Sequence, residues 1–254
     1  MDKLERAIRS TIVNGELAFV GDVNNSCSIK EISKMEIEKF FTPEELENKK
    51  IIYQGSHQVD LLHKFRDIRT ALASNEGGNV VLVTSLAPSY GTSYFARNLA
   101  AVTSFDSTKT SLLVDCNIDR PSVSDTFELM DRPGVLDYVV NESIAIDDVI
   151  HCSGIRRYRC IPAGNSTDNC QEFFTHPRFK KLLTNLKNRY KDRNIFIDAP
   201  PILTSADTRI LLEVCDQVIV VVPYGRVSKE EIATAEKIIP KGKLKGIVLN
   251  EYLR

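Results

Sequence analysis

The stretch TSLAPSYGTSYFARNLAAV, residues 84–102, decides the fold of this chain. It continues the β-branched run NVVLVTS, contains the turn-forming residues Pro88, Ser89 and Gly91, and ends in a segment with apolar residues at helical spacing. The pattern predicts a buried strand, a tight loop and a helix from about Thr92 to Thr103. A loop of this kind presents backbone N–H groups at a helix N-terminus, where anions bind.

The same alternation of apolar runs and amphipathic segments continues from Asn79 to the end of the chain. The strand-like runs are NVVLVTS, TSLLVDC, RYRCIPA, NIFIDAPP, QVIVVVPY and LKGIVLN. Amphipathic segments predict a helix after four of these runs. A loop is predicted after TSLLVDC, and LKGIVLN is the last element. Short buried strands separated by helices indicate an α/β fold, a doubly wound and mainly parallel sheet with helices on both faces. In such sheets, ligands bind at the carboxyl ends of the strands.

Residues 1–75 favour helix and carry many charges. They predict a helical N-terminal extension, a region for oligomerisation or partner binding, ahead of an α/β domain at 76–254. In TPEELENKK, Thr42 is a cap residue, Pro43 lies in the first turn and Glu45 closes a capping box. The segment VDLLHKFRDIRTALAS predicts a further helix with apolar residues along one face.

The composition excludes several classes of protein. A chain of 254 residues with 43% hydrophobic residues can bury one sizeable core, and its net charge of -1 gives no global attraction for nucleic acid. The six cysteines include no C-x-x-C pair and no histidine at zinc-ligand spacing, which indicates reduced thiols and no zinc. The longest apolar run, Val218 to Pro223, is too short to span a bilayer. We therefore expect a cytoplasmic protein.

The loop after Ser85 matches part of the phosphate-binding motif GxxxxGK[ST]. In that motif, backbone N–H groups hold the phosphates, the lysine bridges the outer phosphates and the hydroxyl holds Mg²⁺. Gly91 and Ser93 are in place, but Thr92 stands at the lysine position. By itself the loop leaves two interpretations open, a nucleotide site or an ordinary strand–turn–helix corner.

Two aspartates follow buried strands in the same way. Asp115 ends TSLLVD and Asp198 ends NIFID. A carboxylate at the end of a buried strand must be solvated or paired, and Mg²⁺ with bound water is the usual partner beside a phosphate loop. Each aspartate alone is more often a capping or loop residue. Together with the loop, at the ends of three strands, they favour a magnesium site.

The order of these segments resembles that of the bacterial tyrosine kinases (BY-kinases), P-loop autokinases of capsule and exopolysaccharide assembly, in their stand-alone cytoplasmic form. Residues 84–102 resemble the first Walker motif, LLVDCNIDRPS the second (A′), and IFIDAPPI Walker B. The segments DRPGVLDYV and PAGNSTDNCQEFF resemble those between the second motif and Walker B. The resemblance implies the P-loop fold shared with partition and division-site ATPases, and ATP or ADP with Mg²⁺ as cofactors.

The resemblance also implies roles for residues at matching positions. Asp115 and Asp198 are the catalytic residues of an active enzyme and, with Ser93, the Mg²⁺ ligands. HKFRDIRTAL resembles the helix E-x-x-R-x-x-R of ring assembly, so Arg66 and Arg69 are assigned to oligomerisation. The nucleotide-binding positions, the last of them near the adenine, are Pro88, Ser89, Tyr90, Gly91, Thr92, Ser93 and Asn250.

Several positions depart from the family pattern. Thr92 lacks the positive charge of the Walker lysine, and the loss of one such donor costs about 3 kcal/mol at the transition state. Ala87 holds the position of the additional lysine of partition-type ATPases. Asn117 and Asp119 stand where motif A′ usually has a second aspartate and a basic residue. We therefore expect affinity for ATP, ADP and Mg²⁺ to be weakened or lost.

Two further departures concern assembly and the phosphate acceptor. His63 replaces the glutamate of the ring helix, and Tyr252 is the one tyrosine of the terminal LNEYLR, where the family has a tyrosine-rich tail. These features predict a degenerate BY-kinase-like protein that regulates polysaccharide assembly or export through protein contacts, with weak or no ATP turnover. The resemblance implies as partners a membrane chain-length regulator (polysaccharide co-polymerase), which would hold the protein at the inner face of the membrane, or an active kinase paralogue. The formation of a homo-oligomer is a further alternative.

Two alternatives remain open. The protein could be an active ATP-dependent protein-tyrosine autokinase that recruits a lysine such as Lys109 or Lys229 from outside the loop. It could also be a partition-type ATPase, which has the same fold. The balanced charge, Ala87 and the lack of a basic amphipathic C-terminal helix disfavour that second alternative.

Overall fold

The computed structural model describes residues 12–13, 16–17, 39–72, 79–165, 170–189 and 193–250. The chain divides into two compact units, Met1–Glu36 and Ile37–Arg254. In the first unit, the described residues form an antiparallel pair of strands, β1 (Ile12–Val13) and β2 (Glu16–Leu17). This differs from the helix expected throughout the N-terminal region, because β-branched side chains favour strands. The first predicted helix, MDKLERAIR, lies outside the described residues.

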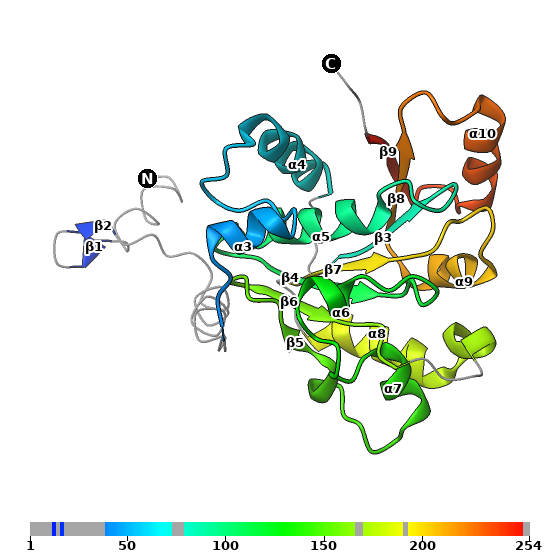
Figure 1. The fold of residues 1–254 in the computed structure, drawn as a ribbon, viewed down its shortest axis with the longest axis horizontal. Helices are drawn as coiled ribbons and strands as arrows, with labels where there is room; N and C mark the ends of the chain where they lie inside the picture. The colour runs from blue at the N-terminus through cyan, green and yellow to red at the C-terminus, as the bar shows by residue number, and fades with distance from the viewer. Residues whose placement is uncertain are drawn as a thin grey trace, which may run out of the picture. The chain divides into compact units, whose positions relative to one another are not determined.

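The second unit is built on a seven-stranded sheet in the order β5-β6-β4-β7-β3-β8-β9 (Figure 1). All neighbouring pairs in it are parallel except β5 with β6, at one edge. The predicted doubly wound, mainly parallel α/β fold is therefore confirmed. The strands are β3 (Val80–Ser85), β4 (Thr110–Asp115), β5 (His151–Cys152), β6 (Tyr158–Ile161), β7 (Arg193–Asp198), β8 (Gln217–Pro223) and β9 (Leu244–Asn250).

Helices cover both faces of the sheet, with α4 and α5 on one side and α8 and α9 on the other (Figure 1). The helices of the α5 face are α3 (Pro43–Asn48), α4 (Val59–Leu72), α5 (Thr92–Thr103) and α6 (Val123–Thr126). Those of the opposite face are α7 (Val135–Val140), α8 (Pro177–Arg189), α9 (Ala206–Val214) and α10 (Lys229–Ile238), with 3-10 turns at Asp147–Val149 and Cys170–Thr175.

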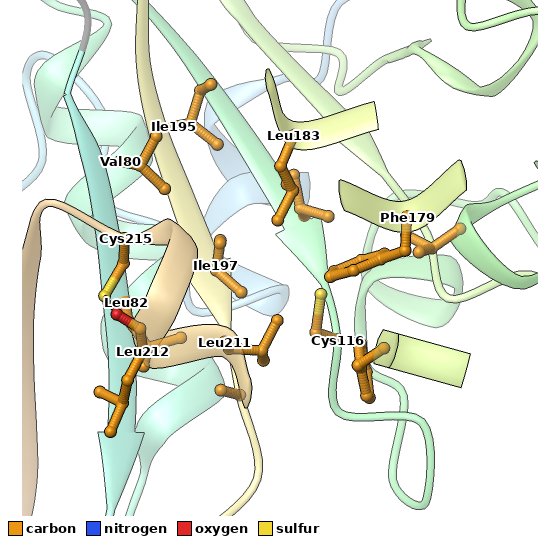
Figure 2. Packing of buried hydrophobic residues seen from close by; sticks show 14 of the residues in the cluster. Val80, Leu82, Cys116, Phe179, Leu183, Ile195, Ile197, Leu211, Leu212 and Cys215 are labelled. Carbon is orange, nitrogen blue, oxygen red and sulfur yellow. Dashed lines mark hydrogen bonds between the residues drawn. The ribbon is translucent and has the colours of Figure 1, made fainter. Parts of the chain in front are cut away.

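Strand β3 shows why these sequences read as uninterrupted apolar runs. Val81 and Val83 face the cluster that contains α5, whereas Val80 and Leu82 face the cluster that contains α8 and α9. Both faces are buried, so a strand of this sheet needs apolar residues at every position. Figure 2 shows part of the second cluster, in which side chains of the strands meet α8 and α9; labelled there are Val80, Leu82, Cys116, Phe179, Leu183, Ile195, Ile197, Leu211, Leu212 and Cys215.

The helices α3 and α4 belong to the compact unit that contains the sheet, which begins at Ile37. The rings of Phe65 on α4 and Phe95 on α5 stack with their centroids 5.2 Å apart. The predicted capping box of α3 is confirmed, since Thr42 Oγ1 accepts a hydrogen bond from Glu45 N at 3.2 Å and Glu45 Oε2 accepts one from Thr42 N at 2.7 Å. The predicted division at residue 75 stays a prediction about domain organisation.

The segment between β4 and β6, predicted as a loop, contains α6, α7 and β5. Helix α7 begins where Asp137 Oδ2 accepts a hydrogen bond from Gly134 N at 2.8 Å. The backbone N–H of Val135 donates to Pro162 O at 2.9 Å, just after β6. The prediction was wrong here because this helix is fixed by a distant part of the chain, whereas the predicted helices have their own hydrophobic periodicity.

Asn98, a fully buried residue of α5, joins this helix to the backbone between α3 and α4. Its Oδ1 accepts a hydrogen bond from Ile52 N at 2.7 Å, and its Nδ2 donates to Lys50 O at 3.0 Å and to Tyr94 O at 2.9 Å. The side-chain amide therefore satisfies backbone groups of two separate segments.

We predict that Asn98→Ala lowers the free energy of unfolding by about 1–3 kcal/mol, because it leaves the buried N–H of Ile52 and the part-buried carbonyl of Lys50 without their partner. Urea denaturation measures the change. Thr103→Val is the control, since the Thr103 hydroxyl donates only to Leu99 O within the same helix. An equal loss in the two variants would contradict a bridging role for Asn98.

Candidate functional site

The loop between β3 and α5 has the backbone of a tight turn. Gly91 has φ 88°, in the left-handed region that favours glycine, and Ser89 has φ 65°. A Cβ atom on Gly91 would lie 2.2 Å from Asn250 Nδ2. That same nitrogen donates a hydrogen bond to Tyr90 O at 3.1 Å. The last residue of β9 therefore holds the loop by a contact that only glycine allows.

A cavity of about 690 Å³ opens at this loop, beside the carboxyl ends of β3 and β7. Five of the predicted nucleotide positions line it: Pro88, Ser89, Gly91, Thr92 and Ser93. Tyr90 instead packs against the hydrophobic cluster of α8 and α9, and Asn250 holds its carbonyl group from outside the cavity lining. The structure thus brings the loop positions together around one cavity.

The opposite wall comes from residues that the sequence analysis did not assign to the site. It consists of the segment after β7 and the first turn of α9, with Thr204, Ser205 and Asp207. Ser205 caps the helix, since its Oγ accepts a hydrogen bond from Thr208 N at 3.2 Å. The capping residue Ser205 was visible in the sequence and could have located the N-terminus of α9. The sequence could not show that this N-terminus lies beside the loop.

The charges that line the cavity are more negative than positive. Among the described residues that line it, Arg120 is the single basic one, and Asp119 and Asp207 are acidic. The Arg120 guanidinium donates a hydrogen bond to Ser89 Oγ at 3.3 Å. Burial, and then the nearby charge of Asp119, raise the pKa of Asp207. The cavity therefore offers one guanidinium and two carboxylates to a bound molecule.

Asp115 is fully buried at the end of β4 and is occupied with the backbone of its own loop. Its Oδ2 accepts hydrogen bonds from Ser122 N at 2.8 Å and Val123 N at 3.0 Å, and its Oδ1 accepts one from Asn117 N at 3.1 Å. Burial raises the pKa of Asp115 to about 6, although these three bonds oppose the shift. Asp115 thus shapes the loop that leads into α6.

Asp198 lies directly beside Asp115, because the two residues are paired in the register of β4 and β7. Its Oδ1 is buried and has no hydrogen-bond partner among the described residues. Burial and the neighbouring carboxyl of Asp115 raise the pKa of Asp198, and a hydrogen bond from the Ser93 hydroxyl opposes the shift. Asp198 therefore keeps an oxygen available for a ligand, and Ser93 lies next to it as the sequence predicted.

The two predicted oligomerisation residues lie elsewhere. Arg66 and Arg69 are half-buried on α4, outside the lining of the cavity. The guanidinium of Arg69 donates a hydrogen bond to Val102 O on α5 at 3.4 Å. Their role in assembly stays a prediction.

None of the helices in the described residues is both long and apolar enough to cross a bilayer.

The sequence is similar to those of known bacterial tyrosine-protein kinases. It is 30% identical over 192 residues to the tyrosine-protein kinase YwqD of Bacillus subtilis, covering 74% of this chain and 79% of YwqD. It is 26% identical over 198 residues to the tyrosine-protein kinase ptk of Acinetobacter johnsonii, covering 76% of this chain. The chain spans only 26% of the length of ptk and 25% of EpsB of Ralstonia nicotianae. No family model matches the sequence.

The fold is similar to that of solved kinase domains. The kinase domain of the Escherichia coli tyrosine kinase ETK superposes with a TM-score of 0.70, over 87% of this chain and 84% of that domain, at 19% identity. At this identity the likeness concerns the fold alone. The match to YwqD extends over most of both chains. The chain therefore belongs to the family of bacterial tyrosine-protein kinases.

Proposed function

We propose that this chain is a degenerate member of its family, which regulates exopolysaccharide or capsule assembly through protein contacts and turns over little or no ATP. The observation that carries the proposal is the lining of the cavity. Thr92 occupies the position of the phosphate-binding lysine, and Asp119 and Asp207 outnumber Arg120.

Electrostatics supports weak binding of a triphosphate. The loop still offers backbone N–H groups and the N-terminus of α5, which attract phosphate. A threonine hydroxyl supplies no charge, however, and a charge-assisted hydrogen bond contributes about 1.5–3 kcal/mol. The carboxylates of Asp119 and Asp207 face the same cavity and repel a polyanion. In this proposal, the loop has a backbone shaped to bind phosphate, and the side chains of the cavity supply little electrostatic attraction for a triphosphate.

The lysines considered as substitutes are poorly situated. Lys109 directly precedes β4, so it lies at the edge of the sheet opposite to the cavity. A strand of this length measures about 20 Å, more than a lysine side chain spans. Lys229 begins α10, at the same edge of the sheet as the loop, but it does not belong to the cavity lining. This geometry favours the degenerate protein over the active autokinase.

The residues present fit a magnesium ion. Mg²⁺ prefers oxygen ligands and is usually held by one or two carboxylates, phosphate oxygens and several waters. Asp198, with an oxygen that has no partner among the described residues, and the Ser93 hydroxyl would hold it, with Asp115 beside them. When bound, the ion would offset phosphate charge. In this proposal, Asp115 orders the loop before α6 and Ser93 orients Asp198.

Weak binding of ATP would leave protein contacts as the way in which this family member acts. We infer that it binds a membrane chain-length regulator or an active kinase paralogue, and that Arg66 and Arg69 on α4 form part of a contact surface. The active autokinase remains the second candidate, because the loop geometry and the free oxygen of Asp198 are compatible with phosphoryl transfer. A partition-type ATPase receives no specific support.

We predict that Thr92→Lys binds ATP or ADP with Mg²⁺ roughly 10- to 100-fold more tightly than the natural chain, because one added charge contributes about 1.5–3 kcal/mol. Isothermal titration measures both affinities. Thr92→Met is the control for side-chain length without charge and should bind as weakly as the natural chain. If the natural chain already binds as tightly as Thr92→Lys, the proposal of a weakened site is wrong.

We predict that the natural chain forms no phosphotyrosine when incubated with labelled ATP and Mg²⁺. Thr92→Lys serves as the comparison that restores the charge. Phosphotyrosine in the natural chain that disappears in Asp198→Ala would restore the active autokinase. The same assay on Tyr252→Phe would then show whether Tyr252 is the acceptor.

We predict that, without Mg²⁺, the titration of Asp115 alone lowers the free energy of unfolding by about 2 kcal/mol as the pH rises from 4 to 6. Asp115 has a pKa of about 6 in the folded chain against 3.8 ordinarily, so the folded state binds the proton more tightly and loses that advantage as the pH rises. Urea denaturation in EDTA measures the slope. In Asp198→Asn the second buried carboxyl, whose pKa is also raised, no longer titrates, so the total fall should be smaller. An unchanged slope would contradict a raised pKa of Asp198.

A further inference from the structure

A second cavity, of about 410 Å³, lies at the other end of α5 from the candidate site. It opens between the segment around α3, the end of α5 and the turn that leads into β6. The N-terminus of α5 lines the first cavity, whereas the residues that follow its last turn line the second. A helix of this length spans about 18 Å. We call the second cavity the aromatic groove, after its principal lining residues Phe40, Phe41, Tyr53, Phe105, Arg156 and Arg157.

Hydrogen bonds and close packing hold the walls of the groove. The backbone N–H of Phe41 donates to Gly154 O at 3.0 Å, and a Cβ atom on Gly154 would lie 2.6 Å from Phe41 Cδ2. On the other side, Arg157 Nε donates to Ser104 O at 2.9 Å and its Nη2 donates to Phe105 O at 3.4 Å. The groove is therefore formed before a partner binds, which lowers the entropy cost of binding.

The side chains of the groove are of the kind that protein interfaces contain. Aromatic residues and arginine are enriched at the centres of such interfaces, and they contribute most of the binding energy. Phe40 leaves 59% of its surface exposed at this groove, and Phe41, Tyr53 and Phe105 are half-buried in it. These rings offer apolar surface that a bound aromatic or aliphatic side chain would remove from water.

The groove carries positive charge. Among the described residues that line it, Arg156 and Arg157 are the charged ones, and none is acidic. Arg156 is exposed, and no described residue forms a hydrogen bond or an ion pair with it. Burial, and then the like charge of Arg156, lower the pKa of Arg157, although Asp106 opposes the shift. Asp106 itself accepts a hydrogen bond from Thr108 N at 2.9 Å. The charge therefore selects an anionic partner.

We propose that the aromatic groove binds an acidic peptide segment of a partner protein, with an aromatic side chain among its rings and a carboxylate at Arg156. A guanidinium binds a carboxylate through two parallel hydrogen bonds. An anionic bilayer instead attracts clusters of unpaired basic residues. The lysines beside the groove, Lys39 and Lys49, are paired with Glu128 at 3.4 and 3.0 Å, so their charge is offset. A concave groove with two arginines thus fits a peptide better than a membrane surface.

The inference rests on the proposed function in one respect, that the chain acts through protein contacts. It places such a contact at the amino ends of β4 and β6, away from the nucleotide loop. Its test uses no nucleotide. A failure would therefore leave the ATP titration and the phosphotyrosine assay unaffected, and an active autokinase would leave the groove unaffected.

The experiment titrates the full chain into the fluorescein-labelled peptide EEDFEEYE and measures the fluorescence anisotropy. We expect Arg156→Glu to weaken binding roughly tenfold, because the variant reverses the charge that meets the peptide. Phe40→Ala should weaken binding at least about fivefold, since an aromatic contact is lost. Added salt should also weaken binding. Both side chains are exposed, so the thermal unfolding midpoint should stay the same.

Three controls separate the charge and the rings from non-specific attraction. Lys241→Glu makes the same kind of charge reversal at an exposed residue before β9, at the opposite edge of the sheet from β6, and should bind like the natural chain. The peptide EEDAEEAE, without aromatic residues, should bind more weakly than EEDFEEYE. The basic peptide KKKFKKYK should not bind.

Several outcomes would overturn the proposal. No binding of EEDFEEYE would do so, as would equal affinities of the natural chain, Arg156→Glu and Phe40→Ala, or of the two acidic peptides. Without peptide binding, attachment to vesicles of phosphatidylserine and phosphatidylcholine that Arg156→Glu abolishes would assign the groove to lipid. Self-association in sedimentation equilibrium that Phe40→Ala abolishes would instead assign it to a second copy of this chain.

Discussion

Two carboxylates buried side by side at the ends of neighbouring parallel strands constrain the whole carboxyl edge of the sheet. Asp115 and Asp198 are paired in register, and both have less than 2% of their surface exposed. Two negative charges on residues paired across neighbouring strands cannot both persist in a buried environment without compensation. Three backbone N–H groups compensate Asp115, and the Ser93 hydroxyl donates a hydrogen bond to Asp198. The loops at this edge are arranged around that requirement.

The cavity above the pair combines a preserved shape with an altered charge. Gly91 approaches Asn250 so closely that a larger residue would clash, and Ser89 adopts a left-handed conformation. Such backbone geometry belongs to a loop that wraps phosphate. The side chains of the lining, however, include Thr92, Asp119 and Asp207, none of which attracts an anion. The cavity thus combines a phosphate-type loop backbone with a lining that carries more acidic than basic side chains.

The family relationship explains the shape, and the individual residues explain the departure from it. An α/β domain can keep its core while its strand-end residues change, because the core depends on both faces of strands such as β3 and hardly on the loops.

The sequence by itself determined six of the seven strands of the main sheet, the main helices and the loop, because each carries its own periodicity, cap or turn residues. Helix α5 begins and ends at the predicted residues, and the capping box of α3 was visible in Thr42 and Glu45. Only the tertiary structure decided α7, which depends on a bond to Pro162, and the opposite wall of the cavity, including Asp207. These features join residues distant in the chain, and contacts of that kind leave no local pattern in a sequence.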